Sequence, residues 1–483
     1  MNSDDDTPGR PLSQELFVSL PIEVQHYIQF IEKQLVLLTM QVQGCMSKIS
    51  ELEGRLAKNS SNSNKPPGSD GLKKEPKTRS LRGKSGRKPG GQLGRIGKTL
   101  EQVPDPDHIE LYSPESCDHC LGSLSGAELI GVEKRQVFDL PDVNVEVTEH
   151  QAEIKICPCC KHKVKGVFPD NIRAPAQYGE RTQALAAYFQ HQHLIPFERV
   201  SQIFEDLYGI SLSPGTCKNM DRRLFKNLEV FELNLKAHLL ACKVLCFDET
   251  GVRCEKKLNW IHVTASCTAT FYGIHRKRGG HALEEFNILP RFEGVAIHDH
   301  WHPYFAYNQV KHGLCNVHHL RELKFVYEQE KKEWAQKVST LLLSAKKIAD
   351  QAREQGKREI APEDIKMIEN QYTSLILEIG IAYFELLEKP GLNLYKRLLR
   401  KMDCVLAFIY DLEIPFSNNQ AEQDLRMEKV KQKISGCFRT FEGGVISCRI
   451  RGYISTSRKQ GWRIINALVD AVRGSPRLLP VCA

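Results

Sequence analysis

The sequence lacks any apolar run long enough to cross a membrane. No stretch of about 18 or more apolar residues occurs, and that is the length at which a spanning helix becomes a candidate. The amino-terminus reads MNSDDDTPGR, which is acidic and has no apolar segment of the kind found in secretion signals. A phosphate-binding loop, GxxxxGK followed by Ser or Thr, is also missing, which disfavours an ATP-driven motor. We therefore expect a cytoplasmic protein with no membrane partner.

Cysteine, by contrast, is plentiful. The chain has 16 cysteines among 483 residues and no recognisable secretion signal, so we expect a reducing compartment in which cysteines bind metal or are buried. Hydrophobic residues make up 41% and charged residues 26%, which is ordinary for a globular protein. At ~100–200 residues per domain, the chain should contain several domains. The net charge is +8, but its distribution along the chain is more informative than its total.

Residues 22–57 predict a coiled coil. Apolar residues recur at alternating spacings of three and four over about four heptads. The seam consists of Ile28, Ile31, Leu35, Leu38, Val42, Cys45, Ile49, Leu52 and Leu56. Gly44 and Gly54 weaken such a helix, so its stability should depend on a partner helix. The alternative is an amphipathic helix packed on its own domain, but we favour self-association because a segment without core-forming residues follows.

Residues 58–100 have the composition of a basic, disordered linker. Gly, Ser, Pro and Asn dominate, and apolar residues are too few to form a core. Lysine and arginine far outnumber the two acids, Asp70 and Glu75. Such a segment is usually a solvated tail, but its glycines would let the backbone approach DNA phosphates closely. The candidate DNA contacts are Arg87, Lys88 and Arg95.

Residues 101–175 contain two CxxC motifs, which are typical of a structural zinc site. The candidate ligands are Cys117, Cys120, Cys157 and Cys160. The residues between the motifs alternate like β-strands, and paired CxxC turns on a β-rich module suit tetrahedral thiolate binding of zinc. A disulfide pair is the alternative, and a reducing compartment disfavours it. Cys159 could substitute for one ligand.

Residues 176–236 predict a helix-turn-helix. Residues 198–208 would form the first helix, residues 209–212 the turn, and Ser213 the start of the second helix. This spacing would place the second helix in a DNA major groove. A helical hairpin with a purely structural role is the alternative. The neighbouring basic linker and zinc module favour DNA binding.

Residues 237–470 have the pattern of a mixed sheet with helices, followed by a tail at 471–483. Three strand-like runs precede a helix and a fourth strand; the runs are 244–247, 260–265 and 270–275, the helix is 282–289, and the fourth strand is 294–298. This order of elements predicts an RNase H-like core.

Three carboxylates could converge in this core. Asp248 and Asp299 each follow an apolar run, KVLCF and GVAIH, at an expected strand end, and Glu422 lies near the start of an expected helix. Each has a commoner explanation: a turn residue for the aspartates, and a capping box with Asn419 as N-cap for Glu422. Their occurrence together favours a catalytic triad. Glu249 is a minor competitor for a role at the metal site.

Such a triad would hold two Mg²⁺ or Mn²⁺ ions. Hard oxygen ligands select these ions over zinc. In two-metal sites the ions lie ~3.5–4 Å apart, and one activates the attacking oxygen while the other stabilises the leaving oxygen. We expect Asp248 to bridge both ions, with Asp299 and Glu422 each holding one. Attack by water would hydrolyse DNA, and attack by a DNA 3′-hydroxyl would transfer a strand.

A mostly helical insertion, about residues 315–410, separates Asp299 from Glu422. It opens with CNVHHLR, in which the possible auxiliary residues are Cys315, His318, His319 and Arg321. The C-x-x-H spacing could bind a metal, but only two ligands are local. A packed cysteine and a hydrogen-bonded histidine explain it equally well, and His319 and Arg321 could instead contact DNA phosphate.

Basic residues are frequent after Glu422 and would form a face for a DNA duplex, with solvated surface as the alternative. The principal candidates are Arg426, Lys429, Lys433 and Arg439, together with Lys431, Arg449, Arg451, Arg458 and Lys459.

Over nearly its whole length the chain resembles the DDE subunit of bacterial insertion-sequence transposases of the IS66 family. The resemblance rests on KNSSNSNKPP, GRKPGGQLGRIG, the paired CxxC motifs, FDET at Asp248, HDHWHPYF at Asp299, LCNVHHLREL, and NNQAEQDLR at Glu422. It implies a DDE recombinase that binds terminal inverted repeats of double-stranded DNA, cleaves them and joins the 3′ ends to target DNA. It also implies accessory transposition proteins, which the elements of this family usually encode.

Two other functions fit parts of the sequence. One is a catalytically inactive, dimeric, zinc-containing DNA-binding regulator, and the other is a DDE-type nuclease that cuts without joining. A regulator has no reason to retain three carboxylates at these element ends. The sequence therefore predicts a multi-domain α/β transposase, with a coiled coil, a zinc-binding β module and a helix-turn-helix before an RNase H-like DDE core that carries a helical insertion.

Overall fold

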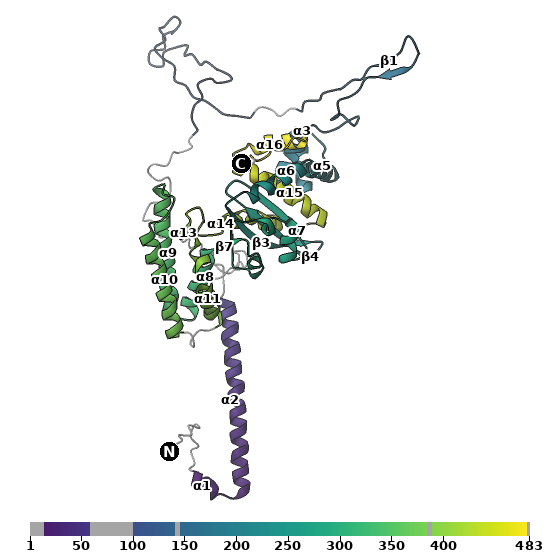
Figure 1. The fold of residues 1–483 in the computed structure, drawn as a ribbon. Helices are drawn as coiled ribbons and strands as arrows, with labels where there is room; N and C mark the ends of the chain where they lie inside the picture. The colour runs from purple at the N-terminus through teal and green to yellow at the C-terminus, as the bar shows by residue number, and fades with distance from the viewer. Residues whose placement is uncertain (1–13, 58–99, 141–144, 384–388, 481–483) are drawn as a thin grey trace.

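The computed structural model describes residues 14–57, 100–140, 145–383 and 389–480 (Figure 1). The linker candidates Arg87, Lys88 and Arg95 lie outside the described residues. Within these ranges, no helix is both long and apolar enough to cross a membrane.

Helix α2, Ile22–Ala57, is a single long helix that follows the short α1, Gln14–Val18 (Figure 1). Its seam residues are exposed: Ile31 keeps 46%, Leu35 62% and Leu38 57% of their accessible surface. The helix therefore does not bury this seam on its own domain, as the alternative required. Self-association remains a prediction.

Replacing Leu38 by lysine should lower the mass of the particle in solution toward that of one chain. A lysine in the seam would lose its burial against a partner helix and would repel its counterpart. Leu37 is a matched control because it is exposed to a similar extent, 53% against 57% for Leu38, but lies outside the seam. Light scattering of Leu38→Lys, Leu37→Lys and the wild type measures the effect. An unchanged mass for Leu38→Lys would contradict self-association through this seam.

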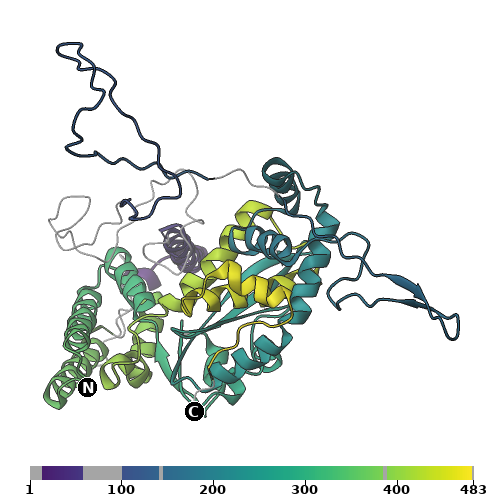
Figure 2. The ribbon, with the colours of Figure 1, turned by 90° about the horizontal axis from the view of Figure 1, so that it is seen from above.

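In residues 100–140 and 145–175 most side chains are exposed, and these ranges contain one small sheet. Strands β1, Ile154–Ile156, and β2, Lys163–Lys165, pair antiparallel, with Ile154 opposite Lys165. Figures 1 and 2 show this hairpin extending outward from the helices and the main sheet. The turn of the hairpin contains the second CxxC motif.

The segment after this hairpin is helical, as the sequence predicts. Its elements are α3 (Glu180–Ala187), the π-helix η2 (Tyr188–Gln192), α4 (Phe197–Tyr208), α5 (Pro214–Asn227) and α6 (Glu229–Leu240). Helix α4 ends where Gly209 adopts a φ of 63°, a conformation that glycine reaches without strain. Helix α5 begins where the Ser213 Oγ accepts a hydrogen bond from the Thr216 N–H at 3.1 Å. Binding of α5 to DNA remains a prediction.

A five-stranded mixed sheet follows, with strand order β5-β4-β3-β6-β7. The strands are β3 (Val244–Cys254), β4 (Lys257–Ala265), β5 (Thr270–His275), β6 (Val295–His298) and β7 (Lys311–Leu314). Strands β3, β4 and β5 pair antiparallel, whereas β6 pairs parallel with both β3 and β7. All four predicted strands are present, but β3 and β4 are longer than predicted, and β7 has no counterpart among the predicted strands.

Helices cover both faces of this sheet. The remaining elements between strands are α7 (Gly280–Phe286) and the 3₁₀ helices η3 (Leu289–Arg291) and η4 (His302–Ala306). The carboxyl-terminal helices are α14 (Asn419–Ser435), α15 (Phe441–Lys459) and α16 (Ile464–Val472), and Figure 2 shows them lying across the sheet. Side chains of β3 alternate between two cores: Leu245 and Phe247 pack with α6 and α16, and Cys246 packs with α8 and α14.

Between β7 and α14 the chain forms a helical insertion, as predicted. Its helices are α8 (Asn316–Gln329), α9 (Glu333–Glu354), α10 (Pro362–Tyr383), α11 (Lys389–Arg400), α12 (Met402–Val405) and α13 (Ala407–Tyr410). The fully buried Trp334 and Tyr372 belong to the same hydrophobic core as Ile297 and Leu314 of the sheet. The insertion is therefore packed onto the sheet and adds to one of its faces.

Candidate functional site

The register of the sheet brings Asp248 and Asp299 together. Strand β3 pairs in parallel with β6, with Cys246 opposite Ile297, and continuing this register by two residues sets Asp248 opposite Asp299. By alternation, both carboxylates belong to the face that Cys246 and Ile297 bury against α8 and α14. Asp299 directly follows the end of β6, as predicted.

The prediction that Asp248 ends its strand is wrong. Strand β3 continues to Cys254 because the residues beyond Asp248 keep pairing with β4, and Asp248 itself lies opposite Val263. The parallel pairing of β3 with β6 is what ends near Asp248. The carboxylate therefore lies where two paired strands separate, which leaves room for other groups beside it.

Glu422 lies in the first turn of α14, and its charge acts on Asp248. In the described part of the chain, the three carboxylates do not form a set of oxygens within 4.8 Å of one another. The turn is fixed by Asn418, which is fully buried: its Nδ2 donates to the carbonyl oxygen of Phe247 at 2.8 Å, and its N–H donates to the Cys315 Sγ at 3.1 Å. The capping-box explanation of Glu422 is wrong, because the N-cap is Asn418 and not Asn419, and its side chain makes no capping bond. In the sequence Asn418 is recognisable only as part of a helix start, and no local pattern signals this anchoring role.

A buried polar cluster holds α14 against the sheet. The Asp424 Oδ2 accepts hydrogen bonds from the Lys459 Nζ at 2.9 Å and from the Thr270 Oγ1 at 3.0 Å, and the Ser455 Oγ donates to Oδ1 at 3.3 Å. These contacts join α14, α15 and β5 two residues after Glu422. No pattern in the sequence predicts this cluster, because an acidic residue in an amphipathic helix usually faces solvent.

The carboxylates of the site repel one another. The pKa of Asp248 is raised well above its usual value, first by burial and then by the charges of Glu249, Asp299 and Glu422. One backbone N–H, that of Glu249, donates to the Asp248 Oδ1 at 2.8 Å and opposes part of this shift. The nearby Lys429 interacts with the Asp248 charge, but burial lowers the pKa of its own amine. The site therefore lacks full charge compensation from the described residues.

Glu249 is engaged on the other side of β3. Its Oε2 accepts from the Tyr304 hydroxyl at 2.5 Å, and its Oε1 accepts from the Arg278 Nε at 2.8 Å. The Arg278 guanidinium lies over the Trp301 ring at 4.1 Å. Because both oxygens of Glu249 already have protein partners, it is a weaker candidate metal ligand than Asp248.

The donor set of Asp248, Asp299 and Glu422 fits hard divalent cations. Carboxylate oxygens are the ligands that Mg²⁺ and Mn²⁺ prefer. Cations would also relieve the repulsion that raises the pKa of Asp248. The assignment of these residues as metal ligands remains a prediction.

The C-x-x-H segment contributes a thiol and an imidazole to the same site. The Cys315 Sγ lies 4.0 Å from the Glu422 Oε1, and the His318 Nε2 lies 3.6 Å from that oxygen. In the described part of the chain this is the one group of three potential ligands whose atoms all lie within 4.8 Å of one another. Burial, followed by the Glu422 charge, raises the pKa of Cys315 to about 12.

The other two residues of this segment have different surroundings. His319 keeps 1% of its surface, and its Nδ1 is 3.0 Å from the Asn316 Oδ1. The expectation that His319 contacts DNA phosphate is therefore wrong, because its imidazole is packed in the core. Arg321 is partly exposed, and its contact with DNA remains a prediction.

Only part of the predicted basic face is exposed. Arg426, Lys433, Arg439 and Arg458 are exposed, whereas Lys429 is partly buried and donates to the Gly251 carbonyl oxygen at 3.1 Å. Four other members of the predicted face contact other parts of the protein, so their inclusion in the face is wrong. Arg449 pairs with Glu232 at 2.6 Å, and Lys459 pairs with Asp424. The buried Arg451 donates a hydrogen bond to the His191 carbonyl oxygen, and Lys431 donates one to Ser447. Each charge is used to join helices.

Both CxxC motifs fold into matching turns. The Leu121 N–H donates to the Cys117 carbonyl oxygen and the Lys161 N–H to that of Cys157, each at 2.9 Å, and both donors have positive φ, 58° and 56°. The backbone amides of Cys120 and His119 lower the pKa of the Cys117 thiol. In the second turn, the backbone amides of Cys160 and Cys159 lower the pKa of the Cys157 thiol. Such N–H donors suit thiolates that bind a metal. Within the described residues, however, the two turns are not brought together as one set of ligands.

Cys117→Ser should lower the zinc bound per chain by about one equivalent, because a Cys₄ site depends on all its thiolates. It should also loosen the hairpin that carries the partner motif, since metal binding supplies folding free energy to small modules. Elemental analysis and limited proteolysis near Ile154 measure both effects. Cys267→Ser, at an exposed cysteine outside the motifs, is the control. Unchanged zinc in Cys117→Ser would remove the structural-site assignment.

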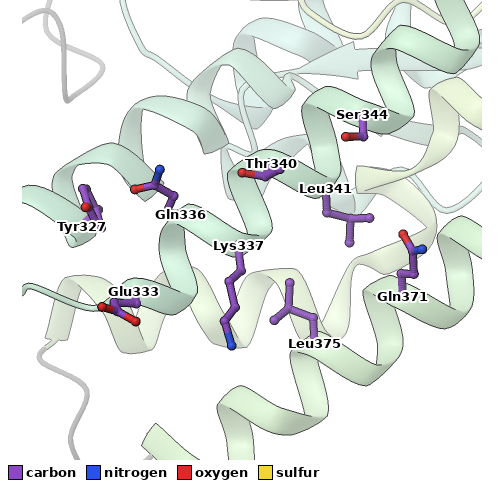
Figure 3. Close-up of a pocket in the computed structure, with 9 residues that line it drawn as sticks. All are labelled: Tyr327, Glu333, Gln336, Lys337, Thr340, Leu341, Ser344, Gln371 and Leu375. Carbon is purple, nitrogen blue, oxygen red and sulfur yellow. The ribbon is translucent and has the colours of Figure 1, made fainter.

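A separate groove of about 670 Å³ lies in the helical insertion (Figure 3). Thr340 and Leu341 of α9 line it, as do Gln371 and Leu375 of α10. It contains none of the predicted site residues. The candidate catalytic chemistry therefore depends on the carboxylate cluster and not on this groove.

Comparison with protein-family models gives three matches. Residues 175–446 match the model described as the transposase IS66 family, and residues 114–161 match the zinc-finger binding domain of transposase IS66. Residues 18–101 match a family of unknown function, DUF6444. The first match covers more than half of the chain and contains Asp248, Asp299 and Glu422. A search of curated proteins found no match.

Proposed function

Because the chain belongs to the IS66 transposase family, we propose that it is a DDE-type transposase that binds the terminal inverted repeats of its element and performs DNA strand cleavage and strand transfer. The observation that carries the proposal is the convergence of negative charge on a buried aspartate: burial first, and then repulsion from Glu249, Asp299 and Glu422, raise the pKa of Asp248. A catalytically inactive regulator would have no use for this repulsion. Strand cleavage by the wild type and by Glu422→Gln tests the proposal.

The strand order supports an RNase H-like core. Three antiparallel strands are followed by a helix and by two further strands, β6 and β7. Strand β6 pairs in parallel with both β3 and β7, which produces the order β5-β4-β3-β6-β7. In this arrangement the carboxylates on β3 and after β6 are neighbours, and α14 adds the third from outside the sheet. The helical insertion between β7 and α14 lengthens the chain between the second and third carboxylates, but the charges of both still act on Asp248.

We assign Asp248 to both metal ions and Asp299 and Glu422 to one ion each. Two Mg²⁺ or Mn²⁺ ions, when bound, would supply activation of the attacking oxygen and charge stabilisation of the leaving oxygen. The residues of the chain position these ligands: Asn418 ties the start of α14 to β3, and Asp424 ties α14 to α15. Lys429 adds a positive charge beside Asp248.

DNA would approach along the exposed basic residues of α14 and the segment after it. Arg426, Lys433 and Arg439 are exposed and follow Glu422 in the chain. Arg426 lies one helical turn from Glu422, so a phosphate held there would lie near that carboxylate, and Lys433 and Arg439 would hold phosphates farther along the duplex. The basic residues Arg87, Lys88 and Arg95 would add sequence-independent contacts. Helix α5 would read the terminal repeats.

The zinc-finger match indicates structural zinc. We assign the ion to Cys117, Cys120, Cys157 and Cys160, each CxxC turn being one half of a Cys₄ site. Self-association through α2 would bring two catalytic cores to the two ends of an element. Accessory transposition proteins would complete the assembly.

A further inference from the structure

Next to the catalytic carboxylates, Cys315, His318 and Glu422 form a ligand set of a different chemical kind. We propose that these residues bind one Zn²⁺ ion in competition with the catalytic Mg²⁺ or Mn²⁺, and that zinc bound there switches strand cleavage off. The inhibitory part rests on the proposed function, because it requires Glu422 to be a catalytic ligand. The binding part does not.

The geometry is close to that of a tetrahedral zinc site. With bonds of about 2.3 Å to sulfur and about 2.0 Å to nitrogen or oxygen, neighbouring ligand atoms lie roughly 3.3–3.6 Å apart. Here the His318 Nε2 is 3.6 Å and the Cys315 Sγ is 4.0 Å from the Glu422 Oε1. The two distances to Glu422 exceed these values by about 0.5 Å or less, and the three ligand atoms all lie within 4.8 Å of one another. The Glu422 side chain keeps 23% of its surface and so has room to move.

The surroundings of Cys315 resemble those of the cysteines that open the two CxxC turns. Its Sγ accepts the Asn418 N–H at 3.1 Å, and the backbone amides of Val317 and His318 at the start of α8 also point to it. In the CxxC turns, amides two and three positions after the first cysteine play the same part. A buried thiol that served only as packing would need no such donors.

The chemical type of the ligands selects zinc. A thiolate and an imidazole are borderline-soft donors that favour Zn²⁺ over Mg²⁺. Three protein ligands leave a fourth position open, unlike a closed structural site. The buried Nδ1 of His318 has no hydrogen-bond partner among the described residues, so no acceptor fixes the imidazole as outer ligands do in tight sites. These features indicate reversible binding and not a permanent structural ion.

Zinc and catalytic metal would exclude each other because they share Glu422. The Glu422 carboxylate turned toward Cys315 and His318 cannot complete the set with Asp248 and Asp299. Zinc binding would release the proton of the Cys315 thiol, and it leaves the aspartates with one ligand fewer for a second ion. The inhibition should therefore be relieved by excess Mg²⁺.

The test is metal binding by the full-length protein whose CxxC motifs are already loaded with zinc. Wild type should bind one further Zn²⁺ per chain, measured by equilibrium dialysis and elemental analysis. Cys315→Ser and His318→Ala should each weaken this binding at least tenfold. Cys437→Ser, at an exposed cysteine outside both ligand sets, should bind as the wild type does. No further ion in the wild type, or equal binding by Cys315→Ser, would overturn the proposal.

A second measurement needs no variant. Co²⁺ added to the zinc-loaded wild type should give thiolate-to-metal absorption, and excess Mg²⁺ should raise the Co²⁺ concentration needed to produce it. Absence of the absorption, or indifference to Mg²⁺, would contradict the shared site. Zinc that fills the site should also stop cleavage of a DNA duplex carrying the element ends, and undiminished cleavage would remove the inhibitory role.

The two proposals fail in different ways. If the wild type cleaves DNA and Glu422→Gln does not, but no further zinc binds, only this inference is wrong. If zinc binds through Cys315 but Glu422→Gln cleaves normally, the catalytic role of Glu422 is wrong and the zinc site stands.

Discussion

Glu422→Gln should bind DNA carrying the element ends as the wild type does, but should cleave it more slowly by a factor on the order of 10²–10³ or more. Glutamine has nearly the same size as glutamate, so the packing at the start of α14 is preserved. It replaces a charged oxygen ligand by an amide, which is a poorer partner for Mg²⁺ or Mn²⁺. The loss should therefore fall on the chemical step.

The measurement is a cleavage time course beside an equilibrium DNA-binding assay, with Mn²⁺ binding followed by electron paramagnetic resonance. Glu413→Gln is the control, because Glu413 is an exposed glutamate, with 64% of its side-chain surface accessible, that pairs with Lys243. Its loss removes a surface ion pair of small energetic value and should change neither binding nor cleavage. Cleavage by Glu422→Gln at the wild-type rate would refute the assignment of the third carboxylate.

Asp424→Ala should be among the most destabilising single changes in the catalytic core, by about 3–5 kcal/mol. The Asp424 and Lys459 side chains keep 12% and 10% of their surface and pair at 2.9 Å. Removing the carboxylate leaves a buried ammonium without its counter-charge and takes an acceptor from the Thr270 hydroxyl. Because the same contacts dock α14, cleavage activity should fall along with stability.

Thermal unfolding of the full chain, followed by circular dichroism, measures the loss as a lower midpoint of the transition that contains the sheet. The double variant Asp424→Ala, Lys459→Met is the informative comparison. It removes both charges, so it should be more stable than Asp424→Ala alone. A double variant that is less stable, by the full sum of the two single losses, would show that the pair acts through separate contacts and not as a buried ion pair.

The sequence analysis succeeded where local patterns decide the structure. Short apolar runs located β3 to β6, and the Gly209 and Ser213 signals located the boundary between α4 and α5. The predictions were wrong where contacts with a distant segment decide the structure. Asp248 resembles a strand end because the apolar run stops there, but hairpin pairing with β4 extends the strand to Cys254.

The predicted basic face is a second case that the local sequence pattern could not decide. In the sequence, Arg449, Arg451 and Lys459 cannot be told from solvated surface residues, because a pattern of charges does not show which group each side chain contacts. Their partners are Glu232, the His191 carbonyl oxygen and Asp424, which lie far away in the chain or on other helices. Burial turns these side chains into connections between helices and leaves Arg426, Lys433 and Arg439 as the exposed candidates.

The sequence by itself determined the family, the elements of the sheet, the two CxxC turns and the three candidate carboxylates, because each depends on residues that are close in the chain or on a recognisable motif. Tertiary structure alone decided what meets at the site. The register between β3 and β6 sets Asp248 opposite Asp299, and the docking of α14 through Asn418 brings Glu422 to Cys315, 107 residues earlier in the chain. Contacts of this kind follow from the packing of whole elements, and no local pattern encodes them.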